Sequence, residues 1–270
     1  KFWGAVWDGR YIWASPIDGD MLIRLDTESG AMLGVNIVNV IDFVAGGGVS
    51  KFSSIGFHPG TRSLFIVPNN ANMIVKVKEA TTVTQAAKRI HIQDGQGGYS
   101  SQTYAPEPLE ATDSNFAFHE YNSWIASTKP SEGGKISYAG GGTIVGDKLW
   151  ILPFGLNARL ISVDIHSGAI YKTGGFPAGF SSSSADGGYF KSCIFDGTHL
   201  WMVPYWADMI VRVEPSGGGM MGYNTGLTGM YKYLGATYSE DKRAVGGGGS
   251  VWCTPAGASV GVGRIKTHDG

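Results

Sequence analysis

The sequence predicts an all-β fold made of repeated blades, and three observations support this prediction. First, an aromatic residue is followed three positions later by proline five times: Trp13 to Pro16, Phe65 to Pro68, Trp150 to Pro153, Trp201 to Pro204 and Trp252 to Pro255. Second, these aromatics lie 52, 85, 51 and 51 positions apart. Third, Gly accounts for 42 of 270 residues without a collagen period, and aromatics make up 12%. Repeats of about 50 residues rich in short strands and tight turns indicate a five-bladed β-propeller.

Each copy of the repeat predicts about four antiparallel strands. The aromatic anchor is preceded by two apolar segments around a Gly-containing turn, which is a hairpin signal: "GAVWDGRYI", "SIGFHPGTRSL", "GTIVGDKL" and "SCIFDGTHL". It is followed by segments that alternate apolar and polar residues and predict a third strand: "MLIRLD", "MIVKVK", "RLISVD" and "MIVRVE". Turns such as "TESG" and a looser apolar stretch such as "AMLGVNIV" complete the blade.

The anchor residues have a structural interpretation. A large aromatic on the second strand fills the space between neighbouring blades, and a proline ends that strand where the chain turns. We therefore expect Trp150 and Trp201 to be buried between adjacent blades.

Two irregularities qualify the prediction of a single propeller domain over residues 1–270. The long second interval places an insertion at about 87–135, unless that region contains a degenerate sixth blade. The last copy, "GGGGSVWCTPAGASVGVGRI", is interpreted as a short final blade from about 243 with a reduced first hairpin. We expect this blade to have three strands or to be completed by a piece outside the sequence. Its open edge would accept a strand from a partner.

The strand–turn–strand core resembles a widespread propeller repeat of the G-K-I-Y-x-x-P-Y-N type. "CIFDGTHLWMVPYWADMIVRVEP" (Cys193 to Pro215) and "IGFHPGTRSLFIVPNNANMIVKV" (Ile55 to Val77) carry this resemblance. It implies a propeller fold and no catalytic residues, because the pattern of that repeat is structural.

Composition and motifs favour no particular chemistry. The formal net charge is −1 with 16% charged residues, so we expect no nucleic-acid partner. No apolar run approaches the roughly 20 residues of a membrane span, so we expect no membrane insertion. Nucleophile-elbow, zinc-protease, P-loop and paired-cysteine motifs are absent from the sequence, and we expect no cofactor. Cys193 and Cys253 fall at different strand positions, which predicts two free, buried thiols.

Recurrent polar residues are candidate site residues, and their positions favour turn formation. Asp8, Asp147 and Asp196 precede the anchor strand, where Asp-Gly favours a hairpin; paired carboxylates of a glycosidase are the alternative. The turn after the proline repeatedly holds an Asp or Asn: Asp20, Asn72, Asn157 and Asp208. Turn formation is favoured over calcium binding there. The six histidines show no metal spacing.

Aromatic residues outside the repeat are the candidate contacts for a ligand or partner. The insertion carries Tyr99, Tyr104, Phe116, His119, Tyr121 and Trp124, and the turn after Pro204 carries Tyr205 and Trp206. Exposed aromatics beside polar groups are typical of sugar or protein recognition. The alternative is that the aromatics of the insertion pack together as a small satellite core.

These observations favour a non-enzymatic scaffold or recognition module in an extracellular or virion-type assembly. It would bind partner proteins, and glycan as a further class, through loops and the open blade edge. Two rivals stay open: a lectin with repeated sugar sites, and a glycosidase or lyase with a site at the central funnel.

Overall fold

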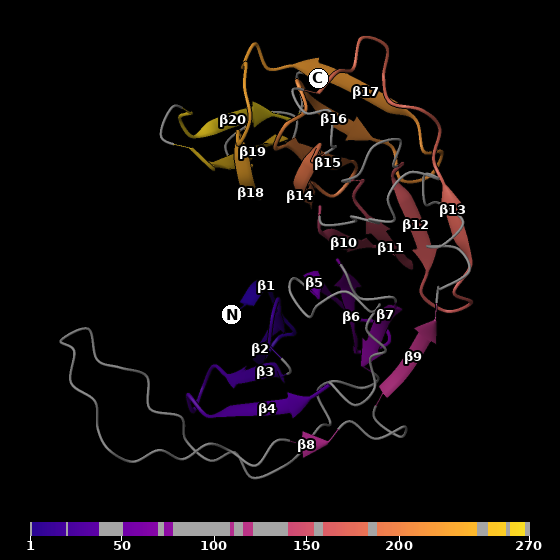
Figure 1. The fold of residues 1–270 in the computed structure, drawn as a ribbon, viewed down its shortest axis with the longest axis vertical. Helices are drawn as coiled ribbons and strands as arrows, with labels where there is room; N and C mark the ends of the chain where they lie inside the picture. Colours follow the sequence, from indigo (N-terminus) through magenta and orange to yellow (C-terminus); the bar gives the residue numbers. More distant parts are fainter. Residues whose placement is uncertain are drawn as a thin grey trace, which may run out of the picture. The chain divides into compact units, whose positions relative to one another are not determined.

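The computed structural model describes residues 2–19, 21–37, 51–69, 73–77, 109–110, 116–120, 140–153, 159–182, 188–241, 248–257 and 260–267. All regular elements among them are β-strands (Figure 1). Within these residues, no helix has the length and apolar character needed to cross a membrane. The chain divides into two compact units, Lys1–Asn122 and Ser123–Gly270.

The first unit contains two sheets. The first has the order β1 (Phe2–Trp7), β2 (Tyr11–Pro16), β3 (Met21–Asp26), β4 (Met32–Asn36) and β8 (Leu109–Glu110). The second has the order β5 (Phe52–His58), β6 (Ser63–Pro68), β7 (Met73–Val77) and β9 (Phe116–Glu120). All neighbouring strands are antiparallel except β4 and β8, which pair in parallel.

The second unit contains three sheets, all antiparallel. The first comprises β10 (Gly142–Val145), β11 (Lys148–Ile151), β12 (Ile161–Asp164) and β13 (Ile170–Lys172). The next comprises β14 (Phe190–Phe195), β15 (Leu200–Pro204), β16 (Met209–Val213) and β17 (Met220–Asn224). The last comprises β18 (Tyr233–Asp241), β19 (Gly248–Pro255) and β20 (Gly263–Lys266).

The five sheets confirm the predicted all-β, five-bladed propeller with about four strands per blade. The alternative of a sixth blade is wrong for the described residues. Both strands found within 87–135 belong to other blades, because β9 is the fourth strand of the second sheet and β8 extends the first. The segment 87–135 therefore contributes two strands to the blades and is not wholly an insertion between them.

The last sheet differs from the expectation in its first hairpin. Its first strand begins at Tyr233, before the expected boundary near 243, and β18 and β19 pair from Tyr233 and Pro255 to Asp241 and Gly248. The hairpin is long rather than reduced. Glycines between the two strands hid the first of them from sequence reasoning, because glycine carries no strand signal. The described part of this sheet has three strands.

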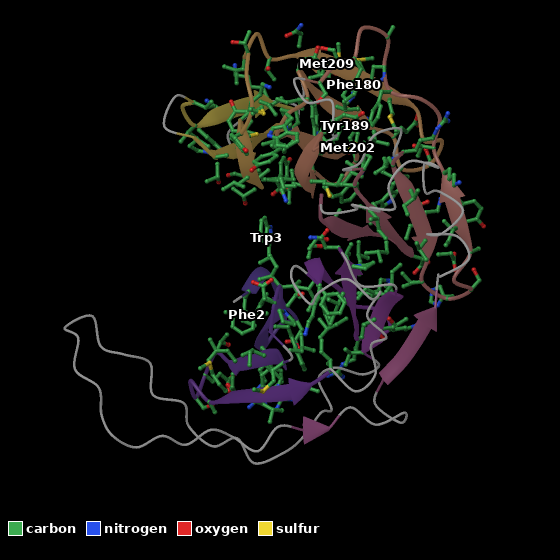
Figure 2. The ribbon with its side chains drawn as sticks, in the orientation of Figure 1. Phe2, Trp3, Phe180, Tyr189, Met202 and Met209 are labelled. Atoms are coloured by element: carbon green, nitrogen blue, oxygen red, sulfur yellow. The ribbon has the colours of Figure 1, made fainter. Side chains whose placement is uncertain are left out.

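The anchor tryptophans pack as predicted. Trp150 is 2% exposed and Trp201 is fully buried. Trp150 belongs to a cluster with Phe190 and Leu200 of the following sheet, and Trp201 to one with Tyr233 of the last sheet. Both tryptophans therefore lie between adjacent blades, as expected. Figure 2 labels Tyr189, Met202 and Met209 in the cluster around Trp150, with Phe180 packed on it.

A second repeated feature was not predicted. An aromatic residue opens the first strand of four sheets and lies opposite the anchor proline, and an irregularity in the register follows it each time: Phe2 with Pro16, Phe52 with Pro68, Phe190 with Pro204 and Tyr233 with Pro255. A bulge of this kind bends a strand and increases its twist. Phe52 and Phe190 are fully buried, whereas Phe2 is 53% exposed (Figure 2).

The two cysteines are free thiols, as predicted. Cys253 is buried, as predicted, whereas Cys193 is only half-buried, against the cluster around Trp150, which corrects the prediction of two buried thiols. Burial raises the pKa of Cys193 to about 12 and that of Cys253 to about 11. Both behave as small apolar residues at neutral pH.

Candidate functional site

The structure describes the side chains of two of the eight predicted contact residues. Tyr205 and Trp206 lie in the turn between β15 and β16. Phe116 and His119 lie on β9 opposite Val77 and Ile74, and only their backbone is described. Four further candidates lie outside the described residues: Tyr99, Tyr104, Tyr121 and Trp124. The candidate site is therefore built around Tyr205 and Trp206.

Backbone hydrogen bonds fix the turn after Pro204. The N–H groups of Tyr205 and Ala207 donate to the Tyr189 carbonyl at 2.8 and 3.2 Å. The Trp206 N–H donates to the Gly188 carbonyl at 3.1 Å. Gly188 has a φ of 83°, and a Cβ there would overlap the Trp206 ring. Glycine is required at this position both for the backbone conformation and for the seating of the indole.

A third aromatic comes from the connection between β17 and β18. The Lys232 N–H donates to the Tyr205 carbonyl at 2.9 Å and holds this connection against the turn. The Tyr231 ring stands at 75° to the rings of both Tyr205 and Trp206, with centroid distances of 5.2 and 5.8 Å. Those two rings are nearly parallel, at 16° and 5.7 Å. We call Tyr205, Trp206 and Tyr231 the aromatic corner.

Two lysines place positive charge beside the aromatic corner. The Lys191 Nζ, from β14, lies 5.6 Å from the centroid of the Tyr205 ring. Burial lowers the pKa of Lys191 to about 8. Lys232 is 1% exposed, and its Nζ donates to the carbonyls of Gly229 at 2.5 Å and Trp206 at 3.5 Å. Burial lowers the pKa of Lys232, and the charge of Asp208 opposes this shift.

The nearby carboxylate is occupied by bonds within the protein. Asp208 accepts hydrogen bonds from the N–H of Ser181 at 3.0 Å and from its hydroxyl at 2.8 Å. A bridge between Ser182 and Ala207 joins the same two segments. The Asp208 carboxylate therefore joins the turn after Pro204 to the segment of Ser181, whereas the turn-forming role predicted for it would place these bonds within its own turn. Burial and the neighbouring Tyr231 raise the pKa of Tyr205, so this phenol stays neutral at physiological pH.

The aromatic corner combines exposed apolar surface with positive charge. Tyr231 is 48% exposed and its neighbour Met230 is 51% exposed, while Tyr205 and Trp206 are half-buried. Rigid aromatic side chains supply contact area at low cost in conformational entropy, so such a surface is suited to recognition. In the described parts of the chain, no group of three or more His, Cys, Asp or Glu side chains is placed to hold a metal ion.

Two of the three carboxylates for which a glycosidase pair was the alternative, Asp8 and Asp196, are turn residues, as predicted. One carboxylate oxygen of Asp8 accepts the N–H groups of Arg10 and Tyr11, and the other accepts the indole N–H of Trp13 at 2.8 Å. Asp196 does the same for Trp201, at 2.6 Å. Sequence reasoning missed the bond to the indole, although the spacing of five residues from Asp to Trp in both copies was a signal for it.

Asp147 does not occupy the comparable position, which corrects the sequence interpretation. Lys148 pairs with Val145 across the turn, so Asp147 falls two positions after the residue that corresponds to Asp8 and Asp196. It contacts His166 at 3.2 Å instead. Among the described residues, no acceptor bonds the buried Trp150 Nε1, because Val145 stands where the other two blades have Asp.

A buried lysine before the first strand is another feature missed from the sequence. Lys51 is 6% exposed, and its N–H donates to the Ile17 carbonyl at 2.5 Å while its Nζ donates to the Gly19 carbonyl at 3.4 Å. Lys232 contacts the turn after Pro204 in the same way. The signal was a lysine directly before the aromatic that opens the strand, in Lys51-Phe52 and Lys232-Tyr233. Through these hydrogen bonds, each lysine joins the start of its own blade to the turn after the proline of the preceding blade.

Comparisons with known proteins support the fold. No protein-family model and no curated protein matches the sequence. A structure of a streptogramin B lyase matches 99% of this chain and 80% of its own, at 17% identity and a TM-score of 0.50. Sqt1 from Saccharomyces cerevisiae matches 91% of this chain and 53% of its own, at 10% identity and a TM-score of 0.55. A structure of a nidogen/laminin complex matches 94% of this chain and 76% of its own, at 10% identity and a TM-score of 0.51. Likeness at these identities shows the fold alone.

Proposed function

We propose that this chain is a non-enzymatic recognition scaffold that binds a partner protein through the aromatic corner, in an extracellular or virion-type assembly. The observation that carries this proposal is the arrangement of Tyr205, Trp206 and Tyr231, which two separate connections hold together at the surface. Tyr and Trp that are rigidly held and partly exposed are the residues that dominate binding energy at protein interfaces. An extracellular or virion-type assembly is proposed because the sequence resembles the G-K-I-Y-x-x-P-Y-N repeat, and propellers of that repeat type occur in such assemblies.

The polar groups of the aromatic corner favour a protein partner over a glycan. A sugar ring needs several hydrogen-bond partners around the aromatic face that it stacks on. The Asp208 carboxylate is bonded to Ser181, and the Lys232 ammonium is bonded to backbone carbonyls. Exposed Met230 adds flexible apolar surface, which is common at peptide-binding sites. The surface thus offers apolar contact and charge rather than a ring of acceptors.

A lectin with repeated sugar sites has less support. Such a protein would carry the same aromatics in the equivalent turn of other blades. The described part of that turn has Ile17, Asp18 and Gly19 in the first blade and Ala256 and Gly257 in the last. The aromatic corner is therefore not repeated in these blades.

No observation specifically favours a glycosidase or lyase. Asp8 and Asp196 are committed to turns and indoles. The similarity to streptogramin B lyase extends to the fold and carries no activity to this chain.

A cross-linking experiment tests the proposal. The photoreactive residue benzoylphenylalanine is placed at position 205, and a control is placed at Tyr171 on β13, which is 54% exposed in the same unit. Both variants are expressed in the organism that makes the chain and irradiated in its native assembly. We expect one reproducible cross-linked protein segment from position 205, absent from position 171 and lost when Tyr231→Asn is added. Equal capture at both positions, or no capture at position 205, would overturn the proposal.

A further inference from the structure

Tyr231 adopts a backbone conformation that disfavours tyrosine. Its φ is 60°, in the left-handed region that a Cβ makes costly. Gly226 and Gly229 in the same connection adopt positive φ of 66° and 88° without this cost. The Tyr231 ring is also half-exposed, so burial repays little of the cost. A costly conformation retained at an exposed aromatic points to a binding role for the side chain.

The geometry of the three rings fits a flat, apolar group. Tyr205 and Trp206 are nearly parallel, and Tyr231 stands across both of them at 75°. The Tyr231 ring contacts the other two rings edge to face, so a further ring that packs on their exposed surfaces would meet aromatic groups. Proline suits such a place, because its ring packs on aromatic faces and its fixed backbone reduces the entropy lost on binding.

The charges beside the rings favour an acidic segment. Among the residues that the structure describes around the rings, Lys191 and Lys232 provide two ammonium groups, and Asp208, which is bonded to Ser181, provides one carboxylate. An incoming carboxylate near Lys191 would gain charge attraction in a partly desolvated place. A cationic ligand would instead be repelled by the two lysines.

The chain itself carries a segment with this chemistry. Between Arg89 and Lys129 the sequence has no Lys or Arg, and its acidic residues are Asp94, Glu107, Glu110, Asp113 and Glu120. Two of the 11 prolines flank one of these acids, in Pro106-Glu107-Pro108. Residues 103–108 lie outside the described residues and directly precede β8 at the edge of the first sheet.

We infer that the aromatic corner binds the acidic, proline-containing stretch 103–108 of a second copy of this chain. This inference rests on the proposed function and names the partner that it requires. The two contacting surfaces differ, so a pair of copies keeps one unused corner on one copy and one unused segment on the other. Contacts of this head-to-tail kind build rings when the rotation closes and filaments when it does not.

Mixing two variants tests the inference. Tyr231→Asn damages the aromatic corner but keeps a residue that tolerates the left-handed backbone, and a segment variant combines Pro106→Ala with Pro108→Ala. Sedimentation velocity should show concentration-dependent assembly of the unmodified chain and at least tenfold weaker association of either variant alone. An equimolar mixture of the two variants should form dimers and stop there, because only one intact pair of surfaces remains. A monomeric unmodified chain at every concentration, or a mixture that stays monomeric, would overturn the inference.

Two further measurements separate other causes of failure. At a concentration where the unmodified chain is monomeric, the melting temperature of Tyr231→Asn should equal or exceed that of the unmodified chain, because the strain is relieved. A large drop would mean that Tyr231 serves the fold. Cross-linking from position 205 in a mixture of ¹⁴N- and ¹⁵N-labelled chains should join residues 103–108 of one copy to the other. Cross-links to a different protein would leave the proposed function standing and overturn self-association, and the absence of any cross-link would overturn both.

Discussion

Trp201 donates its indole N–H to Asp196, and Trp13 makes the same bond to Asp8. The two oxygens of each carboxylate accept different sets of hydrogen bonds. One oxygen closes the turn by accepting two backbone N–H groups, and the other satisfies the indole that lies between blades. A buried indole N–H without an acceptor is costly, so the Asp couples the turn to the packing of the anchor.

Replacing Asp196 with Ala should therefore lower the free energy of unfolding by about 1.5–3 kcal/mol, because a bond to a charged group is lost and a buried N–H is left unpaired. Denaturant unfolding measures the change. Asp147→Ala is the matched control, because Asp147 lies in the corresponding turn of another blade and its side chain contacts the exposed His166 rather than a buried indole. We expect that control to change stability by less than about 0.5 kcal/mol. Equal losses in both variants would show that the indole bond is unimportant.

The thiols allow a test that depends on pH. With pKa values of about 12 for Cys193 and about 11 for Cys253, at most about one thiol in a thousand is ionised at pH 8, and only the thiolate reacts. We expect the native chain to resist iodoacetamide at pH 8. The chain in denaturant should react at both positions, because the pKa of an exposed thiol is near 8.5. Mass spectrometry counts the added groups. Rapid labelling of the native chain would contradict the burial described here.

At the scale of the element, the blades repeat a set of contacts and each blade omits some of them. The anchor aromatic lies opposite a basic residue of the third strand in four blades: Trp13 with Arg24, Phe65 with Lys76, Trp201 with Arg212 and Trp252 with Arg264. In the remaining blade Ser162 lies opposite Trp150. The cation lies over the ring of its anchor in three of these pairs, at 5.1–5.7 Å. The blade of Trp150 thus lacks both the basic residue and the Asp.

Restoring the missing carboxylate should stabilise that blade. Val145→Asp places an acceptor five residues before Trp150, as in the two blades that have the bond. We expect the free energy of unfolding to rise by about 1 kcal/mol, as the gain from a charged hydrogen bond exceeds the loss of half-buried apolar surface. Denaturant unfolding measures it. The effect should vanish when Trp150→Phe removes the N–H in both backgrounds. If Val145→Asp still raises the free energy of unfolding in the Trp150→Phe background, the gain does not come from a hydrogen bond to the indole.

The strands that sequence reasoning identified were those whose signal is local. The anchor, its proline and the alternating third strand all lie within about 20 residues, so the hairpin and its partner could be read directly. The outer strand β9 could not, because the residues between Val77 and Phe116 separate it from its partner β7. The sequence predicted two of the three residues of the aromatic corner. Tyr205 and Trp206 follow an anchor proline, whereas Tyr231 belongs to another connection, and its place beside them depends on the bond from Lys232 to Tyr205.

At the scale of the whole molecule, a net charge of −1 conceals a segregation of charge along the chain. Apart from His91 and His119, the ionisable Asp, Glu, Lys and Arg residues between Arg89 and Lys129 are all acidic, whereas Lys191 and Lys232 lie beside the aromatic corner. Opposite charges in two different parts of one sequence favour contact between copies and disfavour contact of like parts. This separation is what head-to-tail assembly requires.

Assembly should consequently depend on pH through Lys191. The charged lysine is the form that attracts the acidic segment, and its pKa in the unbound chain is about 8. A bound carboxylate raises that pKa, so affinity is full below about pH 8 and falls by up to about tenfold per pH unit as the pH rises above it. Burial raises the pKa of Tyr205 above that of an ordinary tyrosine, and burial lowers the pKa of Lys232, so Lys232 is the other lysine that loses charge as the pH rises.

Sedimentation velocity between pH 5 and 10 measures this dependence, and Lys191→Arg isolates its origin. A guanidinium keeps its charge throughout this range, so the variant should retain assembly at pH 9 and 10, where the unmodified chain dissociates. Lys191→Glu should weaken assembly at every pH, and adding Glu107→Lys should restore it by exchanging the two charges. Loss of assembly at the same pH in the Lys191→Arg variant and the unmodified chain would show that Lys191 does not meet the acidic segment. A Lys191→Glu variant that Glu107→Lys fails to rescue would remove Glu107 as its partner.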